Sequence, residues 1–189
     1  MSPHRRFVVA LGLSLSIAAA SAGPVAAQSP TLPEAVGTLL FPDAVTAMPK
    51  TSGPGSVTYR GSTRPGEPER TILRIASSLA DRCLFEAVFI EAPAPAGVPG
   101  IAVTTAQFTT IDLRRPAQAA LSPAAQPGAA SSFVLSGKAL YCSRNMILEQ
   151  TPKLTLSESC LDTVEDSVLP ADMARKTAAF DALRLACRW

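Results

Sequence analysis

Three acidic residues, Glu86, Asp112 and Glu149, lie in or beside apolar, β-branched stretches of this 189-residue chain. Two carboxyl groups within about 10 Å of each other in a cleft can act as general acid and general base, as in glycoside hydrolysis. Glu86 stands between Phe85 and Ala87, where burial would raise its pKa and suit it to donate a proton. Because charged residues are seldom buried, we expect all three to face solvent and regard them as weak acid/base candidates.

Four cysteines, Cys83, Cys142, Cys160 and Cys187, are the next residues that could do chemistry. None of them forms a C-x-x-C pair, the spacing typical of zinc sites and thioredoxin-like redox motifs. An even number in an oxidising compartment favours two disulfides. Of the three pairings we expect Cys83–Cys142 and Cys160–Cys187. Cys83 would begin one strand and Cys142 would end an antiparallel neighbour. A helix ending at Cys187 could return over Cys160.

Two short motifs lie between Phe133 and Gln150. Ser136-Gly137-Lys138 lacks both the earlier glycine and the following hydroxyl residue of a phosphate-binding loop. Ser143-Arg144-Asn145 is similar to the second motif of penicillin-recognising enzymes, but no lysine after residue 27 has the serine three positions earlier that those enzymes need. We therefore interpret the segment as a strand pair with a turn at residues 143–145 and a disulfide at Cys142.

The only histidine is His4, which lies in the expected signal peptide. After removal of the signal peptide, the chain would have no histidine for a Ser-His-Asp or Cys-His triad or for binding a metal. Glu158, Asp162, Glu165 and Asp166 could group oxygen ligands for a weak calcium site if a helix formed there, but their spacing is not that of an EF-hand. A solvated acidic surface is the favoured interpretation, and we expect neither a metal nor a cofactor.

The N-terminus has the order of a secretory signal peptide. A basic start, Met1 to Arg6, precedes an apolar run to about Ala20, which is shorter than the roughly 20 apolar residues of a membrane span. Cleavage after Ala22 or Ala27 fits the small-residue rule, and we favour Ala27. No cysteine lies near either site to carry a lipid. We expect a periplasmic or extracellular protein that is not a lipoprotein and has no membrane span after signal removal.

The charge balance excludes some partners. The chain has 17 basic and 15 acidic residues, and the loss of Arg5 and Arg6 with the signal would bring the two numbers level. A chain without a basic excess lacks the electrostatic footprint for nucleic acid or an anionic membrane. We interpret the pair Arg114-Arg115 as solvated surface.

Composition and periodicity predict an α+β fold, a single small domain. We expect a mainly antiparallel sheet of about four to six strands, capped by a C-terminal helix and held by two disulfides. Residues 1–27 would be the signal peptide, 28–68 a Pro/Gly-rich segment and 69–189 the disulfide-linked domain. Expected strands cover 83–91, 101–113, 132–142 and 146–150, with 153–156 extending the sheet. Residues 69–79 favour a strand over a helix, and residues 170–188 favour a helix. Three segments have loop composition, and the first of them contains a short expected strand at 57–59 (49–68, 92–100 and 116–130).

These features favour an exported, non-catalytic binding or envelope-maintenance module that contacts an unknown envelope protein or a small ligand. Its candidate contact surfaces are the loops 92–100 and 116–130, because loops on a rigid scaffold often carry function. The alternative is a carboxylate-dependent enzyme or a small-ligand carrier of the periplasm, with Glu86, Asp112 or Glu149 in its pocket. Two of these carboxylates in one cleft would favour the enzyme.

Overall fold

The computed structural model describes residues 29–61, 71–91, 104–124, 126, 128–148 and 154–189. The expected signal peptide, Glu149 and the 92–100 loop lie outside these ranges. The elements follow in the order α1 (Leu32–Leu40), α2 (Pro42–Ala47), β1 (Lys50–Gly53), β2 (Ser56–Gly61), β3 (Thr71–Ser77), β4 (Leu84–Glu91), β5 (Thr104–Asp112), β6 (Gln118–Ser122), β7 (Ser131–Leu148), β8 (Leu154–Val168), the 3-10 helix η1 (Pro170–Asp172) and α3 (Met173–Cys187). This is an α+β arrangement, as expected.

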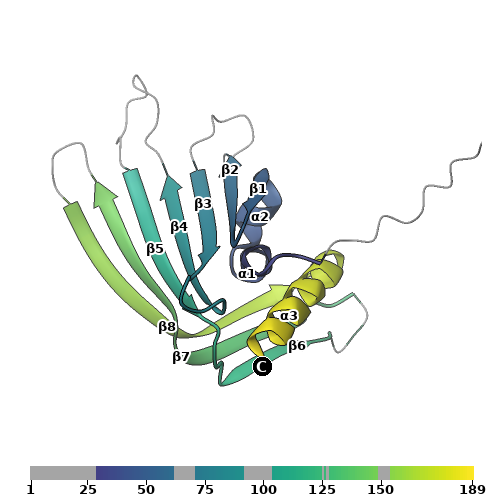
Figure 1. The fold of residues 1–189 in the computed structure, drawn as a ribbon. Coiled ribbons are helices and arrows are strands. Elements are labelled where there is room, and N and C mark those ends of the chain that lie inside the picture. The colour runs from purple at the N-terminus through teal and green to yellow at the C-terminus, as the bar shows by residue number, and fades with distance from the viewer. Residues whose placement is uncertain (1–28, 62–70, 92–103, 125, 127, 149–153) are drawn as a thin grey trace, which may run out of the picture.

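All the described strands belong to one antiparallel sheet, whose long strand β7 connects its two parts (Figure 1). The C-terminal part of β7 pairs with β5, and its N-terminal part pairs with the short strand β6. Strand β8 runs along the other edge of β7 over almost its whole length. The sheet therefore has eight described strands, more than expected, because β1 and β6 were not anticipated, and β8 extends well beyond the expected 153–156.

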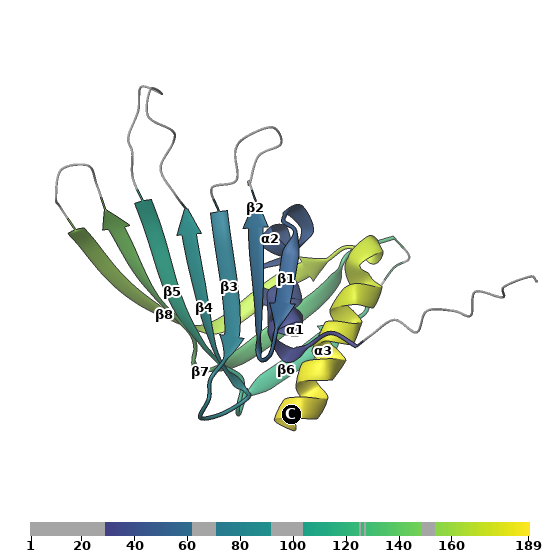
Figure 2. The ribbon, with the colours of Figure 1, turned by 45° about the horizontal axis from the view of Figure 1, so that its top comes forward.

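A bend divides β7 and β8 into two halves. The register between the two strands shifts between Ser136 and Tyr141, and Ala139 has a φ of 50°. Such an irregularity increases the local twist and redirects a strand. Figures 1 and 2 show β7 and β8 curving around α3 as a result.

The helices lie on one face of the sheet, here called the inner face. Helix α1 begins at a capping box, in which the Thr31 side chain accepts from the Glu34 amide and the Glu34 carboxylate accepts from the Thr31 amide at 2.9 Å. It ends at Phe41 because Pro42 has no N–H to continue the hydrogen-bond ladder, and α2 starts there. The inner face carries the core, in which alternate residues of β2, β3 and β4 are fully buried (Val57, Tyr59, Leu73, Ile75 and Phe85).

Helix α3 packs inside the bend of β7 and β8. The ring of Phe180 lies edge-on to Phe133 at 6.2 Å and to Trp189 at 5.8 Å between centroids. The Trp189 indole N–H donates to the Leu113 carbonyl at 2.7 Å. The expected C-terminal helix is confirmed, with its first residues forming η1. None of the helices in the described ranges is long and apolar enough to cross a membrane.

Several strand predictions are confirmed and others are wrong. The strand expected within 69–79 is confirmed as β3, and the expected strand pair β4 and β5 is present. The turn at residues 143–145 is wrong, since β7 continues through them and its alternation places Ser143 and Asn145 on the inner face and Arg144 on the other. The loop prediction for 49–68 is wrong over β1, whereas the short strand expected at 57–59 is confirmed within β2, and the hairpin of the two strands turns at Gly55 with a φ of 67°. The 116–130 loop contains β6.

Both expected disulfide pairings are wrong. The bonds join Cys83 to Cys187, with Cα atoms 5.7 Å apart, and Cys142 to Cys160, with Cα atoms 4.0 Å apart. Cys142 and Cys160 are direct partners in the β7–β8 register. The end of α3 lies beside the start of β4, so Cys187 meets Cys83. Neither proximity is encoded in local sequence, because one depends on which strand the long β7 pairs with and the other on where the end of α3 packs.

Candidate functional site

The two acid/base candidates in the described ranges, Glu86 and Asp112, lie on the outer face of the sheet, opposite the helices. Glu86 is exposed on β4, directly across from Thr110. Asp112 ends β5 and accepts two hydrogen bonds from the Arg114 guanidinium, at 2.9 Å and 2.6 Å. These bonds lower the pKa of Asp112 and outweigh the opposing effect of its partial burial. Glu149 lies outside the described residues. The structure therefore does not bring Glu86 and Asp112 together in one cleft, and Asp112, which lines a cavity, is engaged there by Arg114.

The acidic residues that a helix could have grouped on one face belong to strand β8, where three of them are separately engaged. Asp166 pairs with Lys176 of α3, Asp162 accepts from the Ala139 amide at 2.7 Å, and Glu158 lies 3.6 Å from Arg144. In the described ranges, no three His, Cys, Asp or Glu residues come together as metal ligands would.

The most strongly hydrogen-bonded carboxylate is Glu34, at the start of α1. It accepts from Lys50 Nζ at 2.6 Å, from Ser52 Oγ at 2.7 Å and from Thr31. Burial raises its pKa, but these hydrogen bonds outweigh burial and bring the pKa from 4.5 to about 2. A general base works best with a pKa near the operating pH, so Glu34 is suited to joining α1 to β1 rather than to catalysis. The signal in the sequence that could have identified Glu34 was the T-x-x-E pattern at residues 31–34, which is typical of a capping box at the start of a helix.

Tyr59 is buried beneath α1, next to this cluster. Burial, together with the nearby negative charge of Glu34, raises the pKa of its hydroxyl to about 12. The hydroxyl therefore stays protonated at neutral pH and has little nucleophilic character.

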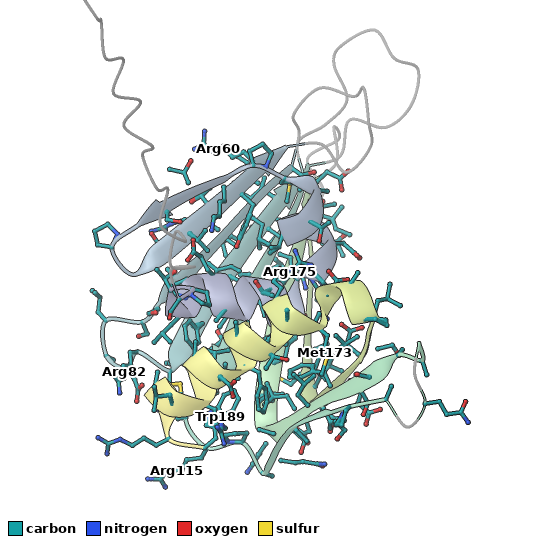
Figure 3. The ribbon with its side chains drawn as sticks, turned by 90° about the vertical axis from the view of Figure 1, so that its right-hand side faces the viewer. Arg60, Arg82, Arg115, Met173, Arg175 and Trp189 are labelled. Atoms are coloured by element: carbon teal, nitrogen blue, oxygen red, sulfur yellow. A yellow bond between two sulfur atoms is a disulfide. The ribbon has the colours of Figure 1, made fainter. Side chains whose placement is uncertain are left out.

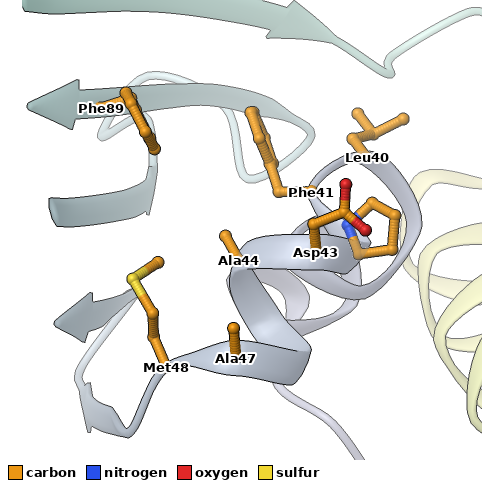
Figure 4. A pocket seen from close by; sticks show the side chains of 8 residues that line it. Leu40, Phe41, Asp43, Ala44, Ala47, Met48 and Phe89 are labelled. Carbon is orange, nitrogen blue, oxygen red and sulfur yellow. The ribbon is translucent and has the colours of Figure 1, made fainter. Parts of the chain in front are cut away.

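An apolar pocket of about 370 Å³ lies between α2 and β4 (Figure 4). We call it the α2 pocket, and it is lined by Leu40, Phe41, Pro42, Asp43, Ala44, Ala47, Met48 and Phe89. All of these residues except Phe89 come from the short segment 40–48, in which α1 ends and α2 begins at Pro42. Phe41 lies at the junction of the two helices, with its ring 6.3 Å from that of Tyr141 on β7. Asp43 is the single charged residue in the lining.

The inner face continues from this pocket as a surface of uncharged polar residues. In register, Phe89 is followed across the sheet by Gln107 on β5, Asn145 on β7 and Ser157 on β8. A parallel row contains Thr109 and Ser143, which are buried, and the exposed Ser159, whose hydroxyl lies 3.2 Å from that of Ser143. Figures 1 and 2 show this part of β5, β7 and β8 extending past the helices. Hydroxyl and amide groups can donate and accept hydrogen bonds without a charge.

The α2 pocket was missed in the sequence because its parts are far apart and individually ordinary. Residues 40–48 have the composition of a short helix with apolar residues, and Phe89 belongs to a strand assigned to the core. The one readable signal was Phe41-Pro42, since a proline after an apolar residue predicts a break in a helix. Comparisons with protein-family models, with curated proteins and with solved structures found no match to this chain.

Proposed function

We propose that this protein is an exported, non-catalytic binding module that carries a small amphipathic ligand in the α2 pocket. The observation that carries the proposal is the continuity between an apolar pocket and an uncharged polar surface. Phe89 lines the pocket, and its neighbour across the sheet, Gln107, begins the polar row. A ligand with an apolar part and a polar part would be matched along this line.

The dimensions and lining of the pocket support a small ligand. Binding pockets typically have volumes of about 300–1,000 Å³ and are lined mainly by apolar side chains with a few polar groups. The α2 pocket, at about 370 Å³, is at the small end of this range. Phe41, Met48 and Phe89 offer it aromatic and thioether surface, which adapts well to alkyl chains.

The charge distribution selects the polar part of the ligand. Asp43 is exposed at the pocket, so it would repel a carboxylate or sulfate and attract an amine. Gln107 and Asn145 can bond to hydroxyl or amide groups. We therefore propose a ligand with a neutral or cationic polar group.

The non-catalytic and exported parts of the proposal rest on other observations. Glu34 has a pKa far below neutrality, and all four cysteines are in disulfides. Two disulfides are typical of proteins outside the reducing cytoplasm. The carboxylate-dependent enzyme, the alternative drawn from the sequence, finds no support in the outer-face positions of Glu86 and Asp112.

The test is displacement of a neutral apolar fluorophore, N-phenyl-1-naphthylamine, by ligands that share an alkyl chain. We expect decanol and decylamine to displace the fluorophore at lower concentration than decanoate. The Ala44→Phe variant fills the pocket and should lose fluorophore binding. Ala80→Phe, in the exposed turn before β4, adds the same ring away from the pocket and should bind like the wild type.

Circular dichroism and a thermal melt of both variants establish that they are folded. Equal fluorophore binding by Ala44→Phe and wild type would overturn the assignment to this pocket. Stronger competition by decanoate than by decylamine would overturn the proposed role of Asp43.

A further inference from the structure

A second cavity, of about 760 Å³, lies at the bend of β7 and is lined mainly by charged residues. Its basic residues are Arg114 and Arg115 after β5, Lys138 in the bend and Arg188 at the end of α3. It shares no lining residue with the α2 pocket. Figure 3 shows Arg115 at the same end of the molecule as Trp189 and Arg82. We call this the basic cavity.

The charges in the basic cavity do not cancel. Two carboxylates, Asp81 and Asp112, line it beside the four basic residues. Asp112 is occupied by Arg114. Asp81 accepts a hydrogen bond from the Cys83 amide at 2.8 Å. Among the ion pairs of the described residues, none involves the remaining three basic side chains, which are exposed (Arg115, Lys138 and Arg188).

The backbone around the cavity is held in unusual conformations. Among the described non-glycine residues, Ala139 and Arg188 are the two with positive φ, at 50° and 59°. Ala139 follows Lys138 directly, and Arg188 occupies the left-handed position after a helix that glycine normally takes. A left-handed residue with a side chain is strained, and such strain concentrates at functional sites.

Close approach of two segments brings the basic residues together. Gly137 of β7 lies against the segment that follows Arg115, since a Cβ atom on it would lie 3.4 Å from the Cα of Pro116, in van der Waals contact. The Ala117 amide donates to the Ser136 carbonyl at 2.7 Å and fixes this contact. The Ser136-Gly137-Lys138 segment thus brings Lys138 to the arginine pair through packing of a bend, without a phosphate-binding loop.

We propose that the basic cavity binds a phosphate group, with Arg115, Lys138 and Arg188 as its ligands. Guanidinium groups bind phosphate through paired hydrogen bonds, and lysine adds a compact positive charge. Three basic side chains without an acidic partner suit a dianion better than a monoanionic carboxylate. The phosphate could belong to a lipid headgroup or to a free molecule, and the chemistry of the cavity is the same for both.

The first experiment is a titration of the oxidised protein with inorganic phosphate and with pyrophosphate, followed by ¹H–¹⁵N NMR at constant ionic strength. We expect saturable shifts at the amides of Arg115, Lys138, Ala139 and Arg188. The Arg115→Gln/Lys138→Gln variant should bind about tenfold more weakly or not at all, because two charge-assisted contacts are lost.

The matched control is Arg60→Gln/Arg74→Gln, which removes the same charge from exposed positions on β2 and β3. It should bind like the wild type. An equal loss in both variants would show a general charge effect and overturn the site, as would shifts spread over the whole surface.

Sedimentation with phosphatidylcholine vesicles containing phosphatidic acid separates the two sources. Binding to these vesicles but not to pure phosphatidylcholine, lost in Arg115→Gln/Lys138→Gln, assigns the phosphate to a lipid. Binding of the free anions alone assigns it to a soluble molecule. Absence of binding to both overturns the proposal. Because none of these residues lines the α2 pocket, the outcome is independent of the fluorophore displacement result.

Discussion

The two halves of the bent sheet differ in what covers their inner face. In the covered half, α3 lies inside the bend, Phe133 and Leu183 are fully buried, and the Cys83–Cys187 disulfide is itself buried. In the open half, Gln107, Asn145 and Ser157 of the inner face are exposed or partly exposed, and the Cys142–Cys160 disulfide lies on the outer face. The same strands, β7 and β8, form both halves. The difference indicates that stability is concentrated under α3, while the open half is available for binding.

The two disulfides offer the largest test of this contrast. Loss of Cys83–Cys187 releases a constraint over 104 residues, and loss of Cys142–Cys160 one over 18 residues. The chain-entropy model gives destabilisations of about 5 and about 3 kcal/mol, respectively. Urea unfolding of the Cys83→Ala/Cys187→Ala and Cys142→Ala/Cys160→Ala variants would measure both. A larger loss for the second pair would contradict the view that the covered half is the stability core.

The ion pair beneath α3 should have the next largest effect. Lys176 of α3 is 4% exposed at its side chain and pairs with Asp166 of β8. We expect Asp166→Asn to cost about 3 kcal/mol, since it leaves a buried ammonium without a counter-charge. Asp181→Asn, which breaks an exposed pair with Arg184 on the same helix, should cost less than about 1 kcal/mol. The free energy of unfolding of the two variants decides the comparison, and equal costs would contradict it.

A second helix-to-sheet ion pair joins Glu34 of α1 to Lys50 of β1. Because the Glu34 carboxylate titrates, the pH dependence of stability measures the contribution of this pair at the exposed edge of the sheet. The Lys50 side chain is 55% exposed, so this pair should contribute less than the pair under α3. The pKa of Glu34 in the folded protein is about 2, below its ordinary value of 4.5. The folded state therefore favours the ionised form, and its contribution to stability is complete above pH 4.5 and is lost as the pH falls toward 2.

Urea unfolding at a series of pH values would measure this contribution. We expect the wild type to lose more stability than Glu34→Gln between pH 5 and about pH 2.5, because the variant has no proton to bind at this position. Other carboxylates, including Asp112, titrate in both proteins and cancel in the difference. Parallel pH profiles for the two proteins would contradict the role of Glu34.

The tests of the two cavities extend the comparison from stability to binding. Arg115 and Lys138 of the basic cavity are exposed and Ala44 of the α2 pocket is partly exposed, and we expect their substitution to change binding with little change in unfolding free energy. This expectation separates them from Asp166 and from the Cys83–Cys187 pair.

Local pattern was sufficient for several elements. Residues 170–188 have no internal proline or glycine and form η1 and α3, and the β-branched stretches at 71–77, 84–91 and 104–112 form β3, β4 and β5. These elements depend on backbone preference and on the alternation of side chains, which are properties of neighbouring residues. The turn at 143–145 failed for the same reason. A polar triplet is typical of a turn, but on an open sheet face Ser143 and Asn145 are compatible with a continuous strand.

The sequence by itself determined the α+β composition, the helix at the C-terminus and the supply of four cysteines without a metal-type spacing. Tertiary structure alone decided which cysteines are paired, since Cys142 meets Cys160 through the register of β7 and β8 and Cys83 meets Cys187 through the position of α3. It also decided that Lys138 joins Arg115 and Arg188, and that Phe89 closes a pocket formed by residues 40–48. The physical reason is that these contacts join residues far apart in the chain, and their formation depends on the bend of β7 and the packing of the whole core rather than on any local preference.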